Sequence, residues 1–355
     1  MTRTDAAAIS PAVPSTAWQE RSLAPDEPAL FAGFGREIMA QQKKVAAKSD
    51  GEPMRGFHAK LHAGLRAEFE VMPGLPEHAC HGVFAVPKIF PALVRFSNGE
   101  PGIHGDWHHE PRGIAIKLIG VPGRKLLPGQ EDAVTQDFLA TSHSVTSAVR
   151  DVTQFMQFIR AERNGFLPVA LYRAVGLSET WRILKALIRR VVLSCVRSMV
   201  TEHFSSTAPI KLGPYAVKFM VQPTDTTAAA KFRLPTKNFL HDELADRLRK
   251  ADIVLDFLVQ FYLDDVRTPI EDTSIAWDSP WLKVAQLRIF GCDLKNSDTN
   301  ALSERVNKLS FNPWHATEDH RPLGNVMRAR RVVYDASAGL RMHSPEPTSL
   351  PPIEG

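Results

Sequence analysis

Hydrophobic residues in the middle and later parts of the chain occur in short β-type runs that are bounded by Pro and Gly. Residues 56–71 show the alternation of apolar and polar positions that places side chains on opposite faces of a strand. Such runs predict the strands of one antiparallel sheet or barrel. The other predicted strands are residues 81–86, 92–97, 113–119, 217–221, 253–262 and 282–290.

Other segments have the spacing of an amphipathic helix. Phe31, Phe34 and Ile38 recur at this spacing in the first of them, and Asp298 is the predicted N-cap of a later one. The predicted helices are residues 29–49, 151–163, 167–200, 238–250, 298–308 and 329–342. Strands that precede and follow a helical insertion at about residues 151–200 predict an α+β domain.

The helix predicted at residues 167–200 has an apolar side and a basic side. Trp181 and Ile188 belong to the apolar side, while Arg182 and Arg197 belong to the basic side. One interpretation packs the apolar side on the domain and leaves the basic side in solvent. The other places the segment from Trp181 to Arg197 on an anionic membrane surface, because basic amphipathic helices bind there.

The composition is that of a globular protein, with 44% apolar and 23% charged residues among 355. A net charge of +4 is too small to argue for nucleic acid in the absence of a local basic patch. Three widely spaced cysteines favour a reducing compartment over a disulfide framework. No segment has the pattern of a secretory signal or a membrane span, so we expect a cytoplasmic protein.

We predict a flexible arm at residues 1–28, a single domain at residues 29–342 and a disordered tail at residues 343–355.

Four short motifs carry candidate chemistry. In the first, Arg330 and Tyr334 are four residues apart on a predicted helix, and Arg341 returns to the same face seven residues later. An Arg beside a phenol lowers the pKa of that phenol, and a phenolate is one of the groups that hold haem iron. The other motifs are Arg55-Gly-Phe-His58-Ala-Lys60, Leu93-Val-Arg95-Phe-Ser97 and Glu110-Pro-Arg-Gly-Ile-Ala115. Taken singly, each motif has an ordinary structural explanation.

In this order and at this spacing, the motifs resemble the pattern of the haem catalase family. The family pattern has Arg, two residues and His-Ala-Lys, then Val-Arg-Phe-Ser, then Pro-Arg-Gly-Phe-Ala, and finally Arg-x-x-x-Tyr with a further Arg. The resemblance extends from about Arg55 to Met342 and includes Arg150-Asp151 followed by Phe155. It implies a catalase-like antiparallel eight-stranded β-barrel with surrounding helices, and a haem b buried in that barrel.

The resemblance also implies a role for each matching residue. Tyr334 would be the axial ligand of a ferric haem iron, kept deprotonated by Arg330. His58 would move protons on the bound peroxide, with Ser97 fixing the tautomer of its ring. The residues implied to hold the haem propionates and to cover one haem face are Arg55, Arg95, Arg341 and Phe155.

The distal side of the implied site departs from the family pattern. Ser142 or His143 stands where the family has an asparagine that orients peroxide, and Ser147 and Ala148 replace an aromatic pair. A wider pocket favours an organic hydroperoxide or a small organic reductant, so we predict a catalase-related peroxidase acting on hydrogen peroxide or organic hydroperoxides. His143 is the candidate for the missing donor. The chain is also shorter than typical catalases, so we expect a homodimer in place of their interlocked tetramer.

Other functions fit the same residues. One is transformation of a fatty-acid hydroperoxide, as in an allene oxide synthase, or haem-dependent oxygenation of another organic substrate. The open distal side and the basic helix would fit such a lipid-derived substrate. A second alternative is a non-catalytic haem-binding barrel. A zinc site at His78, Cys80 and His81 is not favoured, because these ligands lack a partner pair elsewhere.

Overall fold

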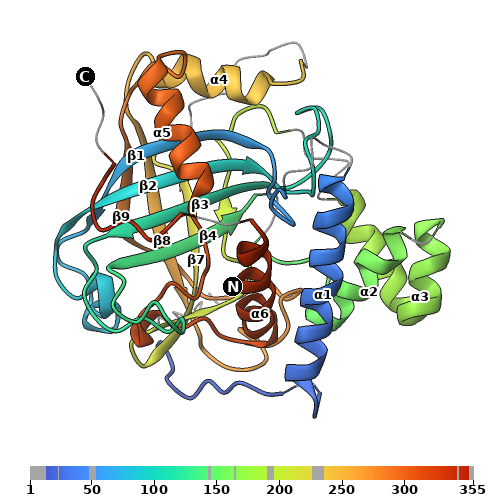
Figure 1. Cartoon of the computed structure of the whole chain (residues 1–355). Helices are drawn as coiled ribbons and strands as arrows, with labels where there is room; N and C mark the ends of the chain where they lie inside the picture. The colour runs from blue at the N-terminus through green and yellow to red at the C-terminus, as the bar shows by residue number, and fades with distance from the viewer. Residues whose placement is uncertain are drawn as a thin grey trace, which may run out of the picture.

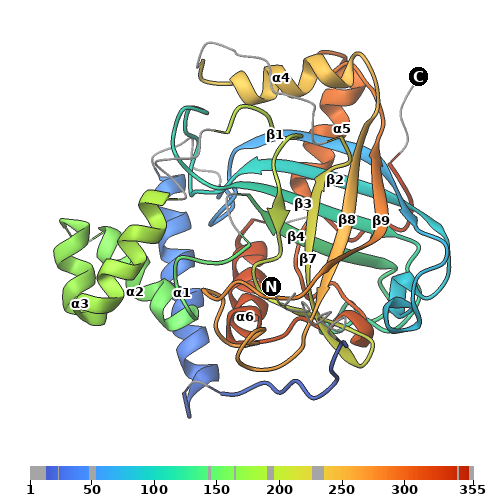
Figure 2. The same ribbon diagram turned by 180° about the vertical axis from the view of Figure 1, so that it is seen from behind.

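A ring of antiparallel strands forms the centre of the molecule (Figures 1 and 2). The computed structural model describes residues 13–22, 24–47, 53–142, 145–163, 165–189, 196–225, 236–341 and 344–351. The strands are β1 (Leu61–Val71), β2 (Ile89–Asn98), β3 (Arg112–Ile119), β4 (Thr135–Thr141), β5 (Phe204–Ser205), β6 (Ile210–Leu212), β7 (Tyr215–Pro223), β8 (Ile253–Phe261) and β9 (Trp281–Ile289). Their order is β5-β4-β3-β2-β1-β9-β8-β7, and pairing of β5 with β7 closes an eight-stranded barrel. The short strand β6 pairs with β7 beside the ring. The predicted α+β barrel is therefore confirmed.

Side chains of the strands alternate between the interior of the barrel and its outer face. The inward side chains are buried and apolar, and aromatic rings meet at the centre, where the ring centroids of Phe69 and Phe257 are 5.2 Å apart. Phe138 and Phe219 complete this cluster, with centroids 5.4 Å apart. The interior is thus a packed core, so the expectation of a ligand buried inside the barrel is wrong. A ligand site has to lie on the outer face of the barrel wall.

Helices cover parts of that outer face (Figures 1 and 2). The helices are α1 (Glu27–Ala46), α2 (Val152–Arg163), α3 (Leu167–Leu187), α4 (Phe239–Leu248), α5 (Ser297–Lys308) and α6 (Asn325–Leu340), with short 3-10 turns η1 (Glu77–Ala79), η2 (Gly82–Phe84) and η4 (Glu318–His320). Helix α5 packs across β1 and β2, and α1 packs along α6. Helix α3 packs on α2 at the edge of the molecule. None of the helices in the described ranges is long and apolar enough to cross a membrane.

Three local differences from the sequence-based expectation have physical causes. The predicted strand at residues 81–86 is instead the turn η2, because Gly82 adopts a φ of 55°. The N-cap of α5 is Asn296 and not Asp298, since the Asn296 side chain accepts a hydrogen bond from the Asp298 amide at 2.9 Å. Strand β4 was not predicted, because Gln136 and Asp137 interrupt its apolar pattern although both side chains are buried.

Both ends of the described chain pack against the barrel. Near the N-terminus, the Trp18 indole donates to the carbonyl oxygen of Pro214 at 2.8 Å, and Glu20 forms an ion pair with Arg328 at 3.1 Å. Near the C-terminus, Glu346 pairs with Lys117 on β3 at 2.6 Å. The predicted flexible arm and disordered tail therefore do not describe residues 13–22 and 344–351, because polar anchors hold these segments on the barrel.

The Lys117 ammonium lies in a buried charge cluster on the outer side of β3. Asp137 of β4 lies opposite it in the strand register, and the ammonium is 2.8 Å from Asp137 Oδ1. The His315 ring also contacts Asp137 at 2.8 Å, and Glu346 completes the cluster. Burial alone would raise the pKa of Asp137, but the charges and hydrogen bonds of Lys117 and His315 outweigh it and hold that pKa below its usual value. The cluster thus ties β3, β4 and two later segments together through ion pairs and hydrogen bonds.

We expect Lys117→Met to destabilise the fold by about 3–5 kcal/mol, because it leaves buried carboxylates without their cation. Thermal or denaturant unfolding would measure the loss. The matched control is Lys283→Met, which breaks the more exposed pair of Lys283 with Asp256 and should lose no more than about 1 kcal/mol. Equal losses for the two variants would contradict the structural role assigned to Lys117.

Candidate functional site

A cavity lies on the outer face of the barrel and is lined by residues of strands β2 to β4 and helix α6. Figure 1 shows the positions of these elements. The empty volume of the cavity is about 870 Å³, including the part that opens to solvent, which is in the usual range for small-molecule sites. Ile38 of α1 and residues 55–58 complete its walls. Seven of the predicted site residues, from three separate parts of the sequence, line this cavity: Arg55, His58, Arg95, Ser97, Arg330, Tyr334 and Arg341.

Helix α6 forms one wall, and a glycine allows the chain to enter it. Gly324 has a φ of 84°, and a Cβ there would lie 2.8 Å from the carbonyl oxygen of Ile270. Arg330 and Tyr334 share one face of the helix because they are four residues apart. Arg341 follows as the C-cap residue. The helix thereby presents one phenol and two guanidiniums to the same cavity.

Two further arginines are held at the cavity by backbone and side-chain oxygens. The Arg55 guanidinium donates from Nη2 to the carbonyl oxygens of Asn307 at 2.9 Å and Leu309 at 2.7 Å. Arg95 of β2 is buried, and its Nη2 donates to the His58 carbonyl at 2.9 Å and to Asn307 Oδ1 at 3.2 Å. Neutral acceptors therefore orient both guanidiniums without neutralising their charge.

The positive charge of the cavity has no counterpart among the described residues that line it. These lining residues include four arginines and no Asp or Glu. The buried Nε atoms of Arg55 and Arg341 have no hydrogen-bond partner in the described chain. Burial lowers the pKa of Arg55, Arg95 and Arg341, and for Arg55 and Arg95 the neighbouring guanidiniums lower it further. Because buried cations require partners, this wall is suited to a ligand with carboxylate groups.

His58 lies at the cavity on the side formed by β2 and β3. Its backbone adopts a φ of 56°, and its amide donates to the carbonyl oxygen of Gly99 at 3.0 Å. The ring Nδ1 is 3.1 Å from the hydroxyl oxygen of Ser97. A positive φ is uncommon for a residue other than glycine, so this backbone is held by its surroundings. The result is an imidazole with one ring nitrogen fixed by a hydroxyl.

A glycine opposite Ser97 leaves room for this imidazole. Gly113 of β3 pairs with Ser97 of β2, and a Cβ at position 113 would lie 2.4 Å from His58 Nδ1 and 2.9 Å from Ser97 Oγ. Any larger residue would displace the ring. Gly113 belongs to the Pro-Arg-Gly motif, but the sequence alone does not mark it as a site residue.

The electrostatic surroundings keep His58 neutral. Burial is the main cause that lowers its pKa to about 3, and the charges of Arg95, Arg330 and Arg55 lower it further. A group with such a pKa carries no charge between pH 5 and pH 8. The neutral imidazole can accept a proton from a bound molecule and give it back.

Part of the remaining wall is formed by small hydroxyl side chains. Thr141 of β4, Ser205 and Ser206 line the cavity. No motif in the sequence marks these three residues as part of a site. Ser142 does not line it, because its hydroxyl accepts a hydrogen bond from the Arg112 amide at 2.9 Å. His143, the predicted donor, lies outside the described residues.

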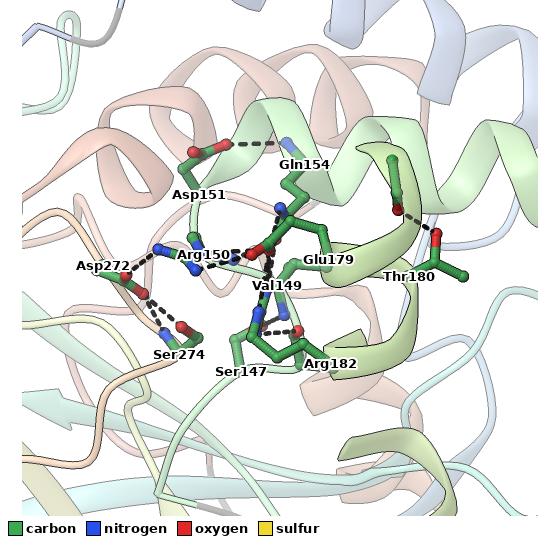
Figure 3. Close-up of polar contacts among 12 residues, drawn as sticks. Ser147, Val149, Arg150, Asp151, Gln154, Glu179, Thr180, Arg182, Asp272 and Ser274 are labelled. Carbon is green, nitrogen blue, oxygen red and sulfur yellow. Dashed lines mark hydrogen bonds and ion pairs between the residues drawn. The ribbon is translucent and has the colours of Figure 1, made fainter. Parts of the chain in front are cut away.

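Phe155 and Arg150 are near the site but not in its lining. The Phe155 ring on α2 packs behind Phe57, with centroids 6.0 Å apart, and it is Phe57 that lines the cavity. Arg150 is held away by ion pairs with Glu179 at 2.8 Å and Asp272 at 3.6 Å (Figure 3). The Arg150-Asp151 segment therefore anchors α2 and α3 and makes no direct contact with the cavity.

Comparison with known proteins was made in sequence and in structure. No protein-family model matches the chain. The chain is 28% identical over 287 residues to a protein of Mycolicibacterium paratuberculosis described as a catalase-related peroxidase. This match covers 74% of the present chain and 82% of the relative. The fold of the present chain is similar to that of a fungal catalase, with a TM-score of 0.62 and 17% identity, and of a bacterial catalase, with a TM-score of 0.58 and 16% identity.

Each of these two structural matches covers 94% of this chain, which spans only 66% of the fungal and 64% of the bacterial catalase. At this level of identity the two catalases establish the fold alone. The closed barrel and the similarity to these catalases show that the chain has a catalase-like fold, and its sequence is similar to that of a protein described as a catalase-related peroxidase.

Proposed function

We propose that the chain is a haem-dependent, catalase-like peroxidase that acts on hydrogen peroxide or organic hydroperoxides. One observation carries this proposal: the described residues that line the cavity include four arginines and no carboxylate, with a phenol on one side and a neutral imidazole on another. The sequence relative described as a catalase-related peroxidase supports the same reaction class. An oxidoreductase of this class takes electrons from a second peroxide molecule or from a small organic reductant.

The residues at the cavity fit haem b. Arg55, Arg95 and Arg341 would pair with its propionates, which accounts for guanidiniums that lack a carboxylate in the described chain. Tyr334 would hold the haem iron through its phenol oxygen, and Arg330 would favour the phenolate form. Bound haem would supply the iron at which the O–O bond of a peroxide is reduced.

His58 and Ser97 would perform the proton transfers. When Nδ1–H of His58 donates to the Ser97 hydroxyl, Nε2 is left as a free acceptor. This nitrogen would take a proton from one peroxide oxygen and return it to the other oxygen as that oxygen leaves. The low pKa of the ring, about 3, keeps the acceptor available at neutral pH.

A second candidate function is transformation of a fatty-acid hydroperoxide or oxygenation of another organic substrate. The described lining residues include the hydroxyls of Thr141, Ser205 and Ser206 but no carboxamide that could orient a second peroxide molecule. This lining favours the second candidate. A non-catalytic haem-binding role would need the arginines and Tyr334 but not His58. The homodimer and the cytoplasmic location stay predictions.

The phenol provides the first test. We expect Tyr334→Phe to lose most of its bound haem when the protein is produced with haem supplied, because a phenyl ring cannot ligate iron. The ratio of haem absorbance to protein absorbance measures retention. Tyr172→Phe, which alters an exposed tyrosine on α3, is the matched control. Full occupancy in the Tyr334 variant would reject the axial assignment.

The imidazole provides the second test. We expect His58→Ala to retain haem and to lose about 10²–10⁴-fold in peroxide turnover, the usual contribution of a positioned acid–base group. Peroxide consumption per bound haem is the measurement, with the exposed His109→Ala as control. Unchanged turnover in His58→Ala would favour a non-catalytic haem-binding role.

A substrate panel separates the two candidate reactions. We expect hydrogen peroxide and small organic hydroperoxides to be consumed faster when a reducing dye is present, as in a peroxidase. Oxygen evolution and dye oxidation are the measurements. Consumption of a fatty-acid hydroperoxide without any reductant, together with inert hydrogen peroxide, would instead establish the second candidate.

A further inference from the structure

Helices α2 and α3 form a projection on one side of the barrel (Figures 1 and 2). Helix α3 lies at the outer edge of this projection and packs on α2. It bends at Gly176, where φ is 80°. One side of α3, with Leu171 and Ile183, is buried in a small apolar cluster that it shares with α2. The opposite side has no neighbour among the helices and strands drawn in either view.

The outer side of α3 is apolar although it is exposed. Phe166, Leu177 and Trp181 are 74%, 73% and 70% exposed. Six of the fourteen large exposed hydrophobic residues of the described chain fall between positions 166 and 188, so they are concentrated in one element. We call this surface the α3 face; its apolar residues are Phe166, Val169, Tyr172, Leu177, Trp181 and Ile188.

The exposed charges of the α3 face have one sign. Arg173, Lys185 and Arg189 are exposed, whereas Glu179 is the only acidic residue between positions 165 and 189. Glu179 accepts hydrogen bonds from Arg150 and Arg182 (Figure 3) and is ion-paired with both. The hydrogen bond from Arg182 is the main cause that lowers the pKa of Glu179 to about 2. The ion pairs with Arg150 and Arg182 thus neutralise the charge of Glu179. The α3 face therefore presents apolar and cationic side chains.

We propose that the α3 face binds peripherally to the surface of a lipid bilayer that contains anionic lipids. Aromatic and aliphatic side chains would enter the boundary between headgroups and acyl chains, and the three cations would meet the anionic headgroups. Trp and Tyr are favoured at this boundary because their rings have an apolar body and a polar tip.

Charge argues for a lipid surface over a second copy of the chain. A symmetric dimer through the α3 face would bring Arg173, Lys185 and Arg189 of two copies into one interface. The centres of protein interfaces are depleted of lysine and of unpaired charge, whereas an anionic bilayer supplies the opposite sign. The α3 face begins at Phe166, whereas the membrane-binding segment predicted from the sequence begins at Trp181. The proposal does not depend on the chemistry in the cavity.

Vesicle co-sedimentation tests the proposal with the full-length protein. Vesicles of phosphatidylcholine alone are compared with vesicles that also contain phosphatidylglycerol. We expect binding to the anionic vesicles to exceed binding to the neutral vesicles by about tenfold or more, because each basic residue near the surface adds attraction. High salt should weaken the binding, since it screens these charges.

Two variants identify the surface. Leu177→Ser combined with Trp181→Ser should abolish most vesicle binding, and Lys185→Gln combined with Arg189→Gln should remove most of the preference for anionic lipid. Trp107→Ser combined with Val266→Ser changes two exposed apolar residues elsewhere and should bind as the parent protein does. None of these positions lines the cavity, so peroxide turnover should be unchanged in all three variants.

Three outcomes would overturn the proposal. The first is no binding to anionic vesicles, and the second is equal binding by the α3-face variants and the control variant. The third is that the parent protein does not bind vesicles but self-associates in sedimentation velocity, and that the Leu177 and Trp181 substitutions abolish this self-association. That result would show that a second copy of the chain occupies the α3 face. Failure of turnover or haem binding would bear on the cavity alone.

Discussion

The pleat of β2, β3 and β4 commits neighbouring side chains to opposite sides of one thin wall. Phe96 belongs to the aromatic core, whereas Arg95 and Ser97 on either side of it face the cavity. Filling the core and forming the site are therefore coupled, because a slip of one residue in register would exchange the two sets. The same register sets Gly113 opposite Ser97 and so leaves space for the imidazole of His58.

The second constraint on the site is charge that the protein itself leaves unbalanced. Arginines at the cavity are oriented by carbonyl and amide oxygens, which hold the guanidiniums in position but leave their charge intact. The cavity arginines lie close to the buried charge cluster around Lys117. The Phe311 ring lies near both sets of charges, with its centroid 5.9 Å from the Arg55 guanidinium and 5.3 Å from the Lys117 ammonium. Lys117 is neutralised by Asp137 and Glu346, whereas the cavity arginines are not. An anion that binds only the folded chain would therefore stabilise it.

Sequence patterns predicted an antiparallel sheet or barrel, and the motifs that resemble the haem catalase family predicted the arginines, the imidazole and the phenol of the cavity, because both kinds of signal are local in the sequence. Short β-type runs bounded by Pro and Gly predicted most of the strands, and the spacing of Arg330 and Tyr334 predicted a shared helix face. What the patterns missed depends on contacts between distant segments. The polar residues of β4 obscured a buried strand, and the need for glycine at position 113 is visible only when β2 pairs with β3. The outer position of the cavity follows from the phenyl rings that fill the interior of the barrel, including Phe69, Phe138 and Phe257.

Closure of the ring has a consequence for the order in which the chain can fold. Strand β1 pairs with β2 on one side, which follows within twenty residues, and with β9 on the other side, which begins at Trp281. During synthesis, one edge of β1 therefore has no partner until most of the chain has left the ribosome. An unpaired edge is a template for pairing with other chains, and such distant pairing is slow. Helix α5, which packs across β1 and β2, emerges after β9 and covers the wall only once the ring can close.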